Sequence, residues 1–210
     1  MLCLHSIIYV KIYVVNVMLV TELKRSEVSR IANDMSENLI KFPLFMFFCM
    51  DMTKRQSFIK DYFSYHLPKW VKNSKVFATD NFDAIVVLSD PLSFEYKYKG
   101  VNAPLMKKYK FSSTVFIHRE NTEQICDILL PYTKPSRVIT IYSGAQVGFE
   151  RIESVIDEVI EYSNAENVTL VFDTFSRRYL PGMEYKGFVT AYRKQFMNTQ
   201  FVETVMTYNM

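Results

Sequence analysis

The 210-residue chain is long enough for one large domain, and a formal net charge of +3 without a basic stripe gives no support for nucleic-acid binding. Hydrophobic residues make up 49% of the sequence, so a substantial core is expected and global disorder is excluded. No pair among Cys3, Cys49 and Cys126 has the spacing of zinc ligands, so we predict no metal site and a reduced, cytoplasmic protein.

The first segment, residues 1–17, is strongly apolar but carries Lys11 in its middle. That lysine argues against a signal peptide, whose positive charge precedes the apolar run, and against a stable membrane span. Its β-branched and aromatic residues favour an extra edge strand or an extended arm. A second interpretation is that Met18 is the natural start and that residues 1–17 are a dispensable leader. A single domain is expected over residues 18–210.

A short strand over residues 19–23 and a helix are expected next. Ser26 is a suitable N-cap for this helix because its hydroxyl can accept from an unpaired backbone N–H group. The apolar face of the helix is formed by Val28, Ile31, Ala32, Met35 and Leu39. Pro43 is expected to end the helix. The large apolar residues 42–50 are expected in the core, with one wall of an acceptor pocket as their alternative role.

A long helix is expected to begin at a capping box formed by Thr53 and Gln56. Pro68 should kink or divide it, because proline lacks the N–H group that a helix interior needs. His66 lies on the apolar face of this helix. We therefore expect it to be a core residue and not a catalytic base.

Residues 76–79 and 84–89 are predicted to be strands of an antiparallel hairpin, since the residues between them favour a turn. A long connection over residues 90–104 follows. It contains Asp90 and Glu95, which are candidate carboxylates for binding an amine acceptor, although solvated loop acids are the simpler interpretation.

After a helix expected over residues 120–130, the central unit of the chain begins. Residues 138–142 are a β-branched strand, residues 143–148 a glycine-containing turn, residues 152–160 an amphipathic helix and residues 168–172 a second buried strand. A strand–helix–strand crossover normally brings its two strands together in parallel. The helix N-terminus then lies at the carboxyl end of the first strand, where anionic ligands tend to bind.

The C-terminal part is expected to be a loop or short helix through Glu184, followed by an antiparallel pair of strands at residues 189–197 and 201–208. Together the elements predict a mixed α/β domain. A central twisted sheet of about six to seven strands should be flanked by helices.

Three segments carry a resemblance to the GCN5-related N-acetyltransferase (GNAT) superfamily. The segment Glu37–Phe45 is similar to the end of the family's first helix, and residues 76–80 with 84–88 are similar to its second and third strands. Leu180–Phe188 is similar to the "(V/A)-P-F-Y-E-x-x-G-F" ending of its fourth helix, with Gly187 and Phe188 on the Gly-Phe pair. The resemblance implies a GNAT-like acyltransferase fold whose two parallel strands splay apart at their carboxyl ends.

The resemblance also implies a binding site for acetyl-CoA or another acyl-CoA. The family's Q/R-x-x-G-x-G/A loop holds the pyrophosphate with backbone N–H groups, and Gly148 or, in a second register, Glu150 falls on its first glycine. The implied binding residues are Tyr142, Gln146, Val147, Gly148, Phe149, Glu150 and Arg151. In either register Glu150 places a carboxylate near the phosphates, which weakens binding unless Arg151 offsets the charge.

For catalysis, the resemblance places the family's tyrosine acid on Met183 and its asparagine on Tyr179. Tyr185, two residues further on, is the candidate acid, and Glu95, Asp90 or Asp173 is the candidate base, while a backbone group near Tyr142 would stabilise the oxyanion. The implied function is N-acyl transfer, in particular N-acetyl transfer, to a small amine-bearing acceptor. The alternative is a catalytically inactive module that binds a small molecule or a protein partner. Either form could be a homodimer.

Overall fold

The computed structural model describes residues 16–91, 105, 108–109, 135–195 and 200–210. The strands are β1 Val17–Leu19, β2 Lys75–Thr79, β3 Ala84–Ser89, β4 Ser136–Ser143, β5 Thr169–Thr174, β6 Val189–Gln195 and β7 Val202–Tyr208. The helices are α1 Arg25–Asn38, α2 Pro43–Phe48, α3 Met52–Asn73, α6 Phe149–Glu166, the 3-10 turn η1 Arg177–Tyr179 and α7 Leu180–Tyr185. Glu95 and the helix expected over residues 120–130 lie outside the described residues.

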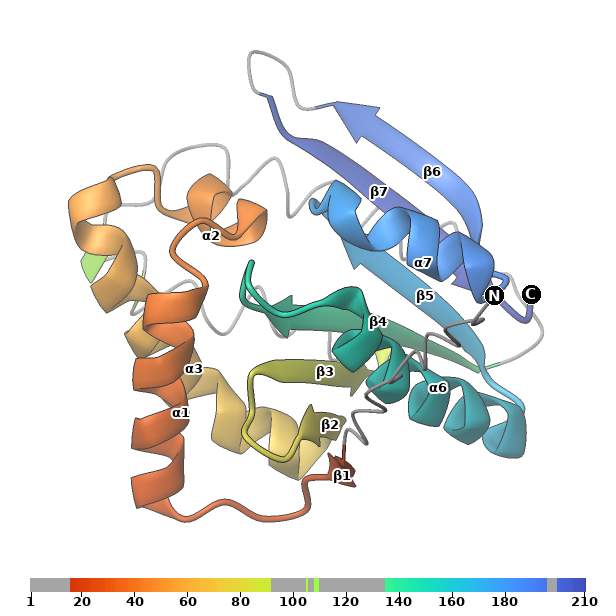
Figure 1. Ribbon diagram of the computed structural model, residues 1–210, viewed down its shortest axis with the longest axis horizontal. Helices are drawn as coiled ribbons and strands as arrows, with labels where there is room; N and C mark the ends of the chain where they lie inside the picture. The colour runs from red at the N-terminus through yellow and green to blue at the C-terminus, as the bar shows by residue number, and fades with distance from the viewer. Residues whose placement is uncertain (1–15, 92–104, 106–107, 110–134, 196–199) are drawn as a thin grey trace, which may run out of the picture.

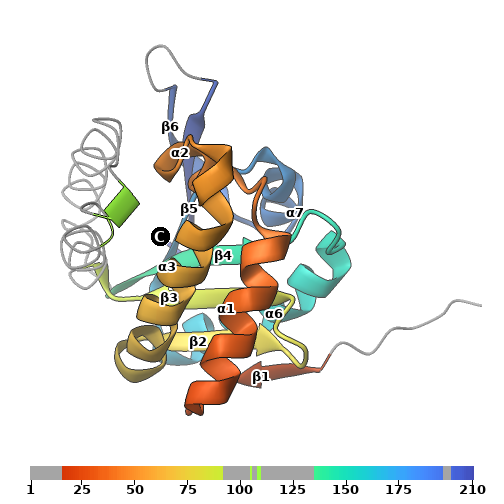
Figure 2. The ribbon, with the colours of Figure 1, turned by 90° about the vertical axis from the view of Figure 1, so that its left-hand side faces the viewer.

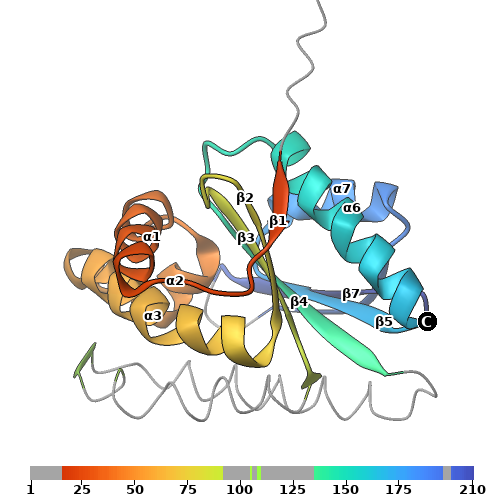
Figure 3. The same ribbon diagram turned by 90° about the horizontal axis from the view of Figure 1, so that it is seen from below.

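The strands form one seven-stranded mixed sheet in the order β1-β2-β3-β4-β5-β7-β6. Only β4 and β5 are parallel, whereas the other neighbours are antiparallel. The expected hairpin, crossover and terminal pair of strands are all confirmed. Helices α1, α2 and α3 cover one face of the sheet, and α6 and α7 cover the other (Figures 1 and 3). In the described ranges, no helix is long and apolar enough to span a membrane.

The sheet divides the hydrophobic core in two. One cluster joins α1, α2 and α3 to their face of the sheet through large buried rings such as Phe45 and Phe63. The second joins α6 and α7 to the opposite face, with Ile152 and Met183 fully buried. Figure 2 shows the first layer from the front, with α1 and α3 crossing the strands. The apolar face expected on the first helix is buried.

Several expected helix ends differ from those observed. The strand expected at residues 19–23 is β1, two residues earlier, and α1 is capped at Lys24 and not at Ser26. The Lys24 N–H group donates to the Glu27 carboxylate at 2.8 Å, and Ser26 lies inside the helix. Pro43 does not end α1, which stops at Asn38. Pro43 instead begins α2. Proline is tolerated there because it lacks an N–H group, and N–H groups in the first turn of a helix have no partner within the helix.

Helix α3 is capped by Asp51, not by the box expected at Thr53 and Gln56. The Asp51 carboxylate accepts a hydrogen bond from the Thr53 backbone N–H at 3.0 Å and another from the Thr53 hydroxyl at 2.6 Å. The helix is not divided at Pro68 and continues to Asn73.

A buried arginine of α3 fixes the position of α2. The Arg55 guanidinium donates to the carbonyl oxygens of Ile40, Cys49 and Met50 at 2.8–3.1 Å, on both sides of α2. Hydrogen bonds from a buried charged group are stronger than those between neutral groups. The residues at the start of α2 are therefore held at a defined place above the sheet.

The parallel pair separates at its carboxyl ends, as expected. Pairing of β4 with β5 runs from Ser136 opposite Thr169 to Ile139 opposite Phe172. Beyond this point β4 continues beside β3 alone, and β5 pairs with β7. The second half of β4 and the end of β5 thus diverge at the centre of the sheet.

Candidate functional site

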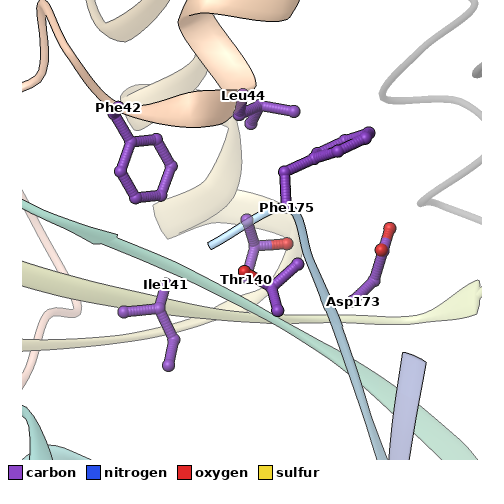
Figure 4. Close-up of a pocket in the computed structure, with 7 residues that line it drawn as sticks. Phe42, Leu44, Thr140, Ile141, Asp173 and Phe175 are labelled. Atoms are coloured by element: carbon purple, nitrogen blue, oxygen red, sulfur yellow. The ribbon is translucent and has the colours of Figure 1, made fainter. Parts of the chain in front are cut away.

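A small pocket lies where β4 and β5 separate (Figure 4). Its volume is about 20 Å³. It is lined by Phe42, Leu44, Thr140, Ile141, Asp173, Thr174 and Phe175. The strands supply its floor, and Phe42 and Leu44 reach it from the start of α2 (Figure 4). The expectation that residues 42–50 form one wall of a pocket is thus met by two of them, while Phe45 and Phe47 are fully buried in the core.

The polar side of this pocket comes from the ends of the two strands. Val171 and Phe175 pack on the α1–α3 side of the sheet, so Asp173, which lies between them in β5, points to the same side. Thr174 points to the other side, and its hydroxyl accepts from the Ser176 N–H at 3.0 Å. Of the three expected catalytic residues, Asp173 is the one that the structure places in the pocket.

Phe42 forms part of the pocket wall and packs against the clusters on both sides of the sheet. Its ring centroid lies 6.4 Å from that of Tyr142 on β4 and 6.5 Å from that of Tyr179 after β5. A third contact, at 6.0 Å, joins it to Phe45. Three aromatic neighbours at these distances hold a ring in one orientation.

Tyr142, an expected binding residue, is fully buried below the pocket. Its hydroxyl lies 3.0 Å from the Tyr62 hydroxyl, and its ring stacks on Trp70 with centroids 5.2 Å apart. His66 stacks on the other side of Trp70 and is buried, as expected for a core histidine. Burial raises the pKa of Tyr62, so this tyrosine is neutral. The side chain of Tyr142 is therefore part of a rigid support for its own backbone.

Arg178 binds the turn after β4 through two hydrogen bonds. The guanidinium donates to the carbonyl oxygen of Gly144 at 2.8 Å and to that of Val147. Val147 is buried, whereas Gln146 and Gly148 are exposed. Gly148 is the N-cap of α6 and provides no side chain to occupy the N–H groups of the first turn. Two carbonyl oxygens of the turn are thus bound by Arg178, and the N-cap residue of α6 contributes no capping side chain.

Two side chains work against an anion at this helix end. The Glu150 side chain folds back over the turn. Its carboxylate lies so close to Gly148 that a Cβ atom on this glycine would overlap it. Arg151 does not offset that charge: its guanidinium lies 3.1 Å from Asp83 and 3.7 Å from Asp80, on the turn between β2 and β3. The guanidinium that could offset the charge of Glu150 is thus paired with two other carboxylates.

Two other expected binding residues of the turn, Gln146 and Phe149, contact the neighbouring helices. The Gln146 amide donates to the Asn38 side chain at the end of α1, at 2.5 Å. The Phe149 ring packs directly on Gly182 of α7, where a Cβ would overlap it. These contacts connect the turn to both layers of helices.

Tyr185, the expected acid, is the last residue of α7 and is 84% exposed. Tyr185 does not lie with the residues that line the pocket. A catalytic role for Tyr185 remains a prediction, and its position does not support that role. Met183 is buried in the core. Tyr179, which like Tyr142 contacts Phe42 in the pocket wall, has its hydroxyl 2.8 Å from that of Ser143 at the end of β4. Burial raises the pKa of Tyr179, so it keeps its proton.

Sequence reasoning missed Thr140, Thr174 and Arg178 as site residues, and it named Phe42 only as part of residues 42–50 and Tyr179 only as the position of the family's asparagine. Phe42 was hidden among eight other residues of an apolar run. The two threonines had a signal, since Thr174 ends β5 and Thr140 lies in the second half of β4, toward the carboxyl ends where ligands of α/β sheets bind. Arg178 had none, because it acts on residues more than 30 positions away.

Comparison with solved structures identifies the architecture. The polyamine N-acetyltransferase of Drosophila melanogaster, which catalyses the formation of N-acetylagmatine, matches with a TM-score of 0.60 at 9% identity, over 93% of this chain and 100% of that one. The chain has the GNAT fold. An agmatine N-acetyltransferase matches with a TM-score of 0.56 at 9% identity, over 91% of this chain and 98% of that one.

A third structural neighbour is the C-terminal condensation domain of Ebony, in complex with β-alanyl-dopamine. Its TM-score is 0.58 at 10% identity, over 92% of this chain and 99% of that one. No protein-family model and no curated protein matches the sequence. Within residues 16–91, 105, 108–109, 135–195 and 200–210, no group of three or more His, Cys, Asp or Glu side chains could hold a metal ion.

Proposed function

We propose that this protein transfers an acyl group, in particular acetyl, from acyl-CoA to the nitrogen of a small amine. The observation that carries the proposal is the pocket between the diverging ends of β4 and β5, with the Asp173 carboxylate in its wall. The fold neighbours named as polyamine and agmatine N-acetyltransferases support the same reaction type.

In this proposal the methyl end of the acetyl group lies in the pocket and the CoA pyrophosphate lies at the N–H groups of residues 146–151. The amine nitrogen attacks the thioester carbonyl carbon, and the C–S bond then breaks to release the CoA thiol. A backbone N–H group near Tyr142 would stabilise the oxyanion, supported by the buried aromatic rings beneath it. Preorganised support of this kind lowers the barrier because the donor needs no rearrangement during the reaction.

Asp173 is the proposed base. The attacking nitrogen must lose a proton, and a carboxylate within reach of an ammonium both attracts the cationic amine and accepts that proton directly or through one water molecule. Glu95 stays a second candidate base. The departing thiolate would take up a proton from solvent or from Tyr179, whose ring contacts Phe42 in the pocket wall.

The test is an assay of thiol release from acetyl-CoA with agmatine, spermidine and dopamine as acceptors, with mass spectrometry of the N-acetylated product. We expect Asp173→Asn to lower kcat/KM for the amine by roughly 100-fold. The matched control is Glu161→Gln, an exposed acid on the far part of α6. Equal activity of the Asp173→Asn and unmodified proteins would remove Asp173 from the mechanism.

A second candidate function is a non-catalytic module that uses the same cleft to bind a small molecule or a partner. Two observations favour it. The Glu150 carboxylate lies over the turn that would hold phosphates, and buried Met183 stands where the family has its tyrosine acid. This module would release no thiol with any amine and would not bind CoA, so the two functions are separated by a binding titration with CoA.

A further inference from the structure

The wall of the pocket contains two side chains from the start of α2, Phe42 and the buried Leu44. Thr140 and Ile141 belong to β4, and Asp173 and Thr174 to β5, so the sheet sets their positions. Phe175 stacks on Phe47 with centroids 5.1 Å apart and is part of the core. Phe42 is different, because it is the N-cap of α2 and only partly buried.

Phe42 also determines how far the pocket extends. Its ring fills the space between Tyr142 on one side of the sheet and Tyr179 on the other. With the ring in place, the remaining volume of about 20 Å³ has room for one water-sized group. A methyl group is of this size, whereas a longer acyl chain would meet the walls of the pocket, of which the Phe42 ring is one.

We infer that Phe42 restricts the acyl donor to acetyl-CoA, and that the pocket behind it would take longer acyl chains if the ring were removed. This inference rests on the proposed function. The ring is a rigid stop, because its aromatic contacts and the α2 backbone held by Arg55 leave it no other orientation without loss of packing. The pocket lining is mostly apolar, so a longer hydrocarbon chain would be stabilised once space exists.

The magnitude follows from the usual discrimination of apolar pockets, in which one methylene too many changes relative affinity or rate by about 10-fold or more. Butyryl-CoA has two methylenes more than acetyl-CoA and hexanoyl-CoA has four. The unmodified protein should therefore bind hexanoyl-CoA at least about tenfold more weakly than acetyl-CoA. Phe42→Ala should remove or reverse that difference.

The experiment is calorimetric titration of the full chain with free CoA, acetyl-CoA, butyryl-CoA and hexanoyl-CoA, which requires no acceptor. The variants are Phe42→Ala and the control Phe48→Ala, which also truncates a buried phenylalanine of α2 but one that does not line the pocket. We expect the ratio of hexanoyl-CoA to acetyl-CoA dissociation constants to fall at least about tenfold in Phe42→Ala and to change less than about twofold in Phe48→Ala. Phe42→Leu, which preserves more packing, should give an intermediate ratio and serves if the alanine variant does not fold.

Free CoA separates the two ways of failing. If free CoA binds all variants equally and the chain-length ratio is unchanged in both Phe42 variants, the inference is wrong and the proposed function stands. An equal shift in Phe48→Ala would also overturn it, because the effect would then be a general loosening of α2. If neither free CoA nor any acyl-CoA binds the unmodified protein, the proposed function fails and the inference fails with it.

Discussion

Arg178 Nη1 lies 2.8 Å from the carbonyl oxygen of Gly144, and its second nitrogen reaches Val147 in the same turn. One guanidinium thereby connects the segment after β5 to the turn after β4, across the diverging strands. Because the carbonyl oxygens of the turn are bound from below, its exposed amides are held in a fixed arrangement. The stability of this turn should depend on a residue that lies outside it.

We therefore predict that Arg178→Met increases hydrogen exchange of the amides of residues 145–148 and lowers the free energy of unfolding by about 1 kcal/mol, since the hydrogen bonds are partly exposed to solvent. Arg178→Lys should restore only part of the protection, because a lysine cannot bind two carbonyl oxygens with a planar fork. Arg177→Met, in the exposed neighbour, is the control. Unchanged exchange in Arg178→Met would show that the turn is fixed by other contacts.

Gly182 gives a prediction with an unusual sign. Replacing a glycine inside a helix by alanine ordinarily stabilises the helix by up to about 1 kcal/mol. Here a Cβ would overlap the Phe149 ring, so Gly182→Ala should lower the free energy of unfolding by about 1–3 kcal/mol. In a Phe149→Ala background the same change should be neutral or stabilising. Urea denaturation of the four proteins measures both effects, and a stabilising Gly182→Ala change with Phe149 present would contradict the packing described.

The buried hydroxyl pair of Tyr62 and Tyr142 gives a prediction on pH. Burial raises the pKa of Tyr62 above its unfolded value of about 10, so the folded protein holds this proton to higher pH than the unfolded chain does. The contribution of Tyr62 to the free energy of unfolding is present below pH 10 and is lost as the pH rises further. The unmodified protein should lose stability above pH 10 more steeply than Tyr62→Phe. Thermal unfolding between pH 8 and 11 tests this, and parallel curves would contradict it.

Strong local patterns predicted most of the fold. The β-branched strands and the amphipathic helix of the crossover identified β4, α6 and β5, and the turn around Asn81 identified the hairpin. Helix ends were predicted less well, because several polar side chains compete for the same unpaired N–H groups. At the start of α1 the Glu27 carboxylate, and not the Ser26 hydroxyl, accepts from a free N–H group. At the start of α3 the accepting side chain is Asp51 and not Thr53.

The site was less accessible to sequence reasoning for a physical reason. Asp173 could be identified because it directly follows a buried strand. In contrast, Phe42 meets Tyr142 and Tyr179 only after α2 has packed on the sheet, and Gln146 meets Asn38 across 108 positions of sequence. The position of the Arg151 side chain depended on the acids of a distant turn. Contacts of this range are a product of the fold and leave no local pattern.

Glu150 is the residue that we expect to limit CoA affinity. Glu150→Gly should tighten binding of acetyl-CoA by about 1–2 kcal/mol, because it removes both a negative charge and a side chain from the N-terminus of α6. Glu150→Gln removes the charge alone, and its gain should shrink at high salt. Glu158→Gln, an exposed acid further along the same helix, is the control. Equal affinities in all four proteins would mean that phosphate does not lie near this carboxylate.

The most direct test of the central claim is hydrogen exchange of the unmodified protein with and without millimolar acetyl-CoA. We predict weak binding with protection of the amides of residues 146–151 and of the β4 residues that border the pocket, around Thr140 and Ile141. Absence of any protection at millimolar acetyl-CoA, or protection confined to another part of the chain, would contradict the assignment of this cleft as an acyl-CoA site.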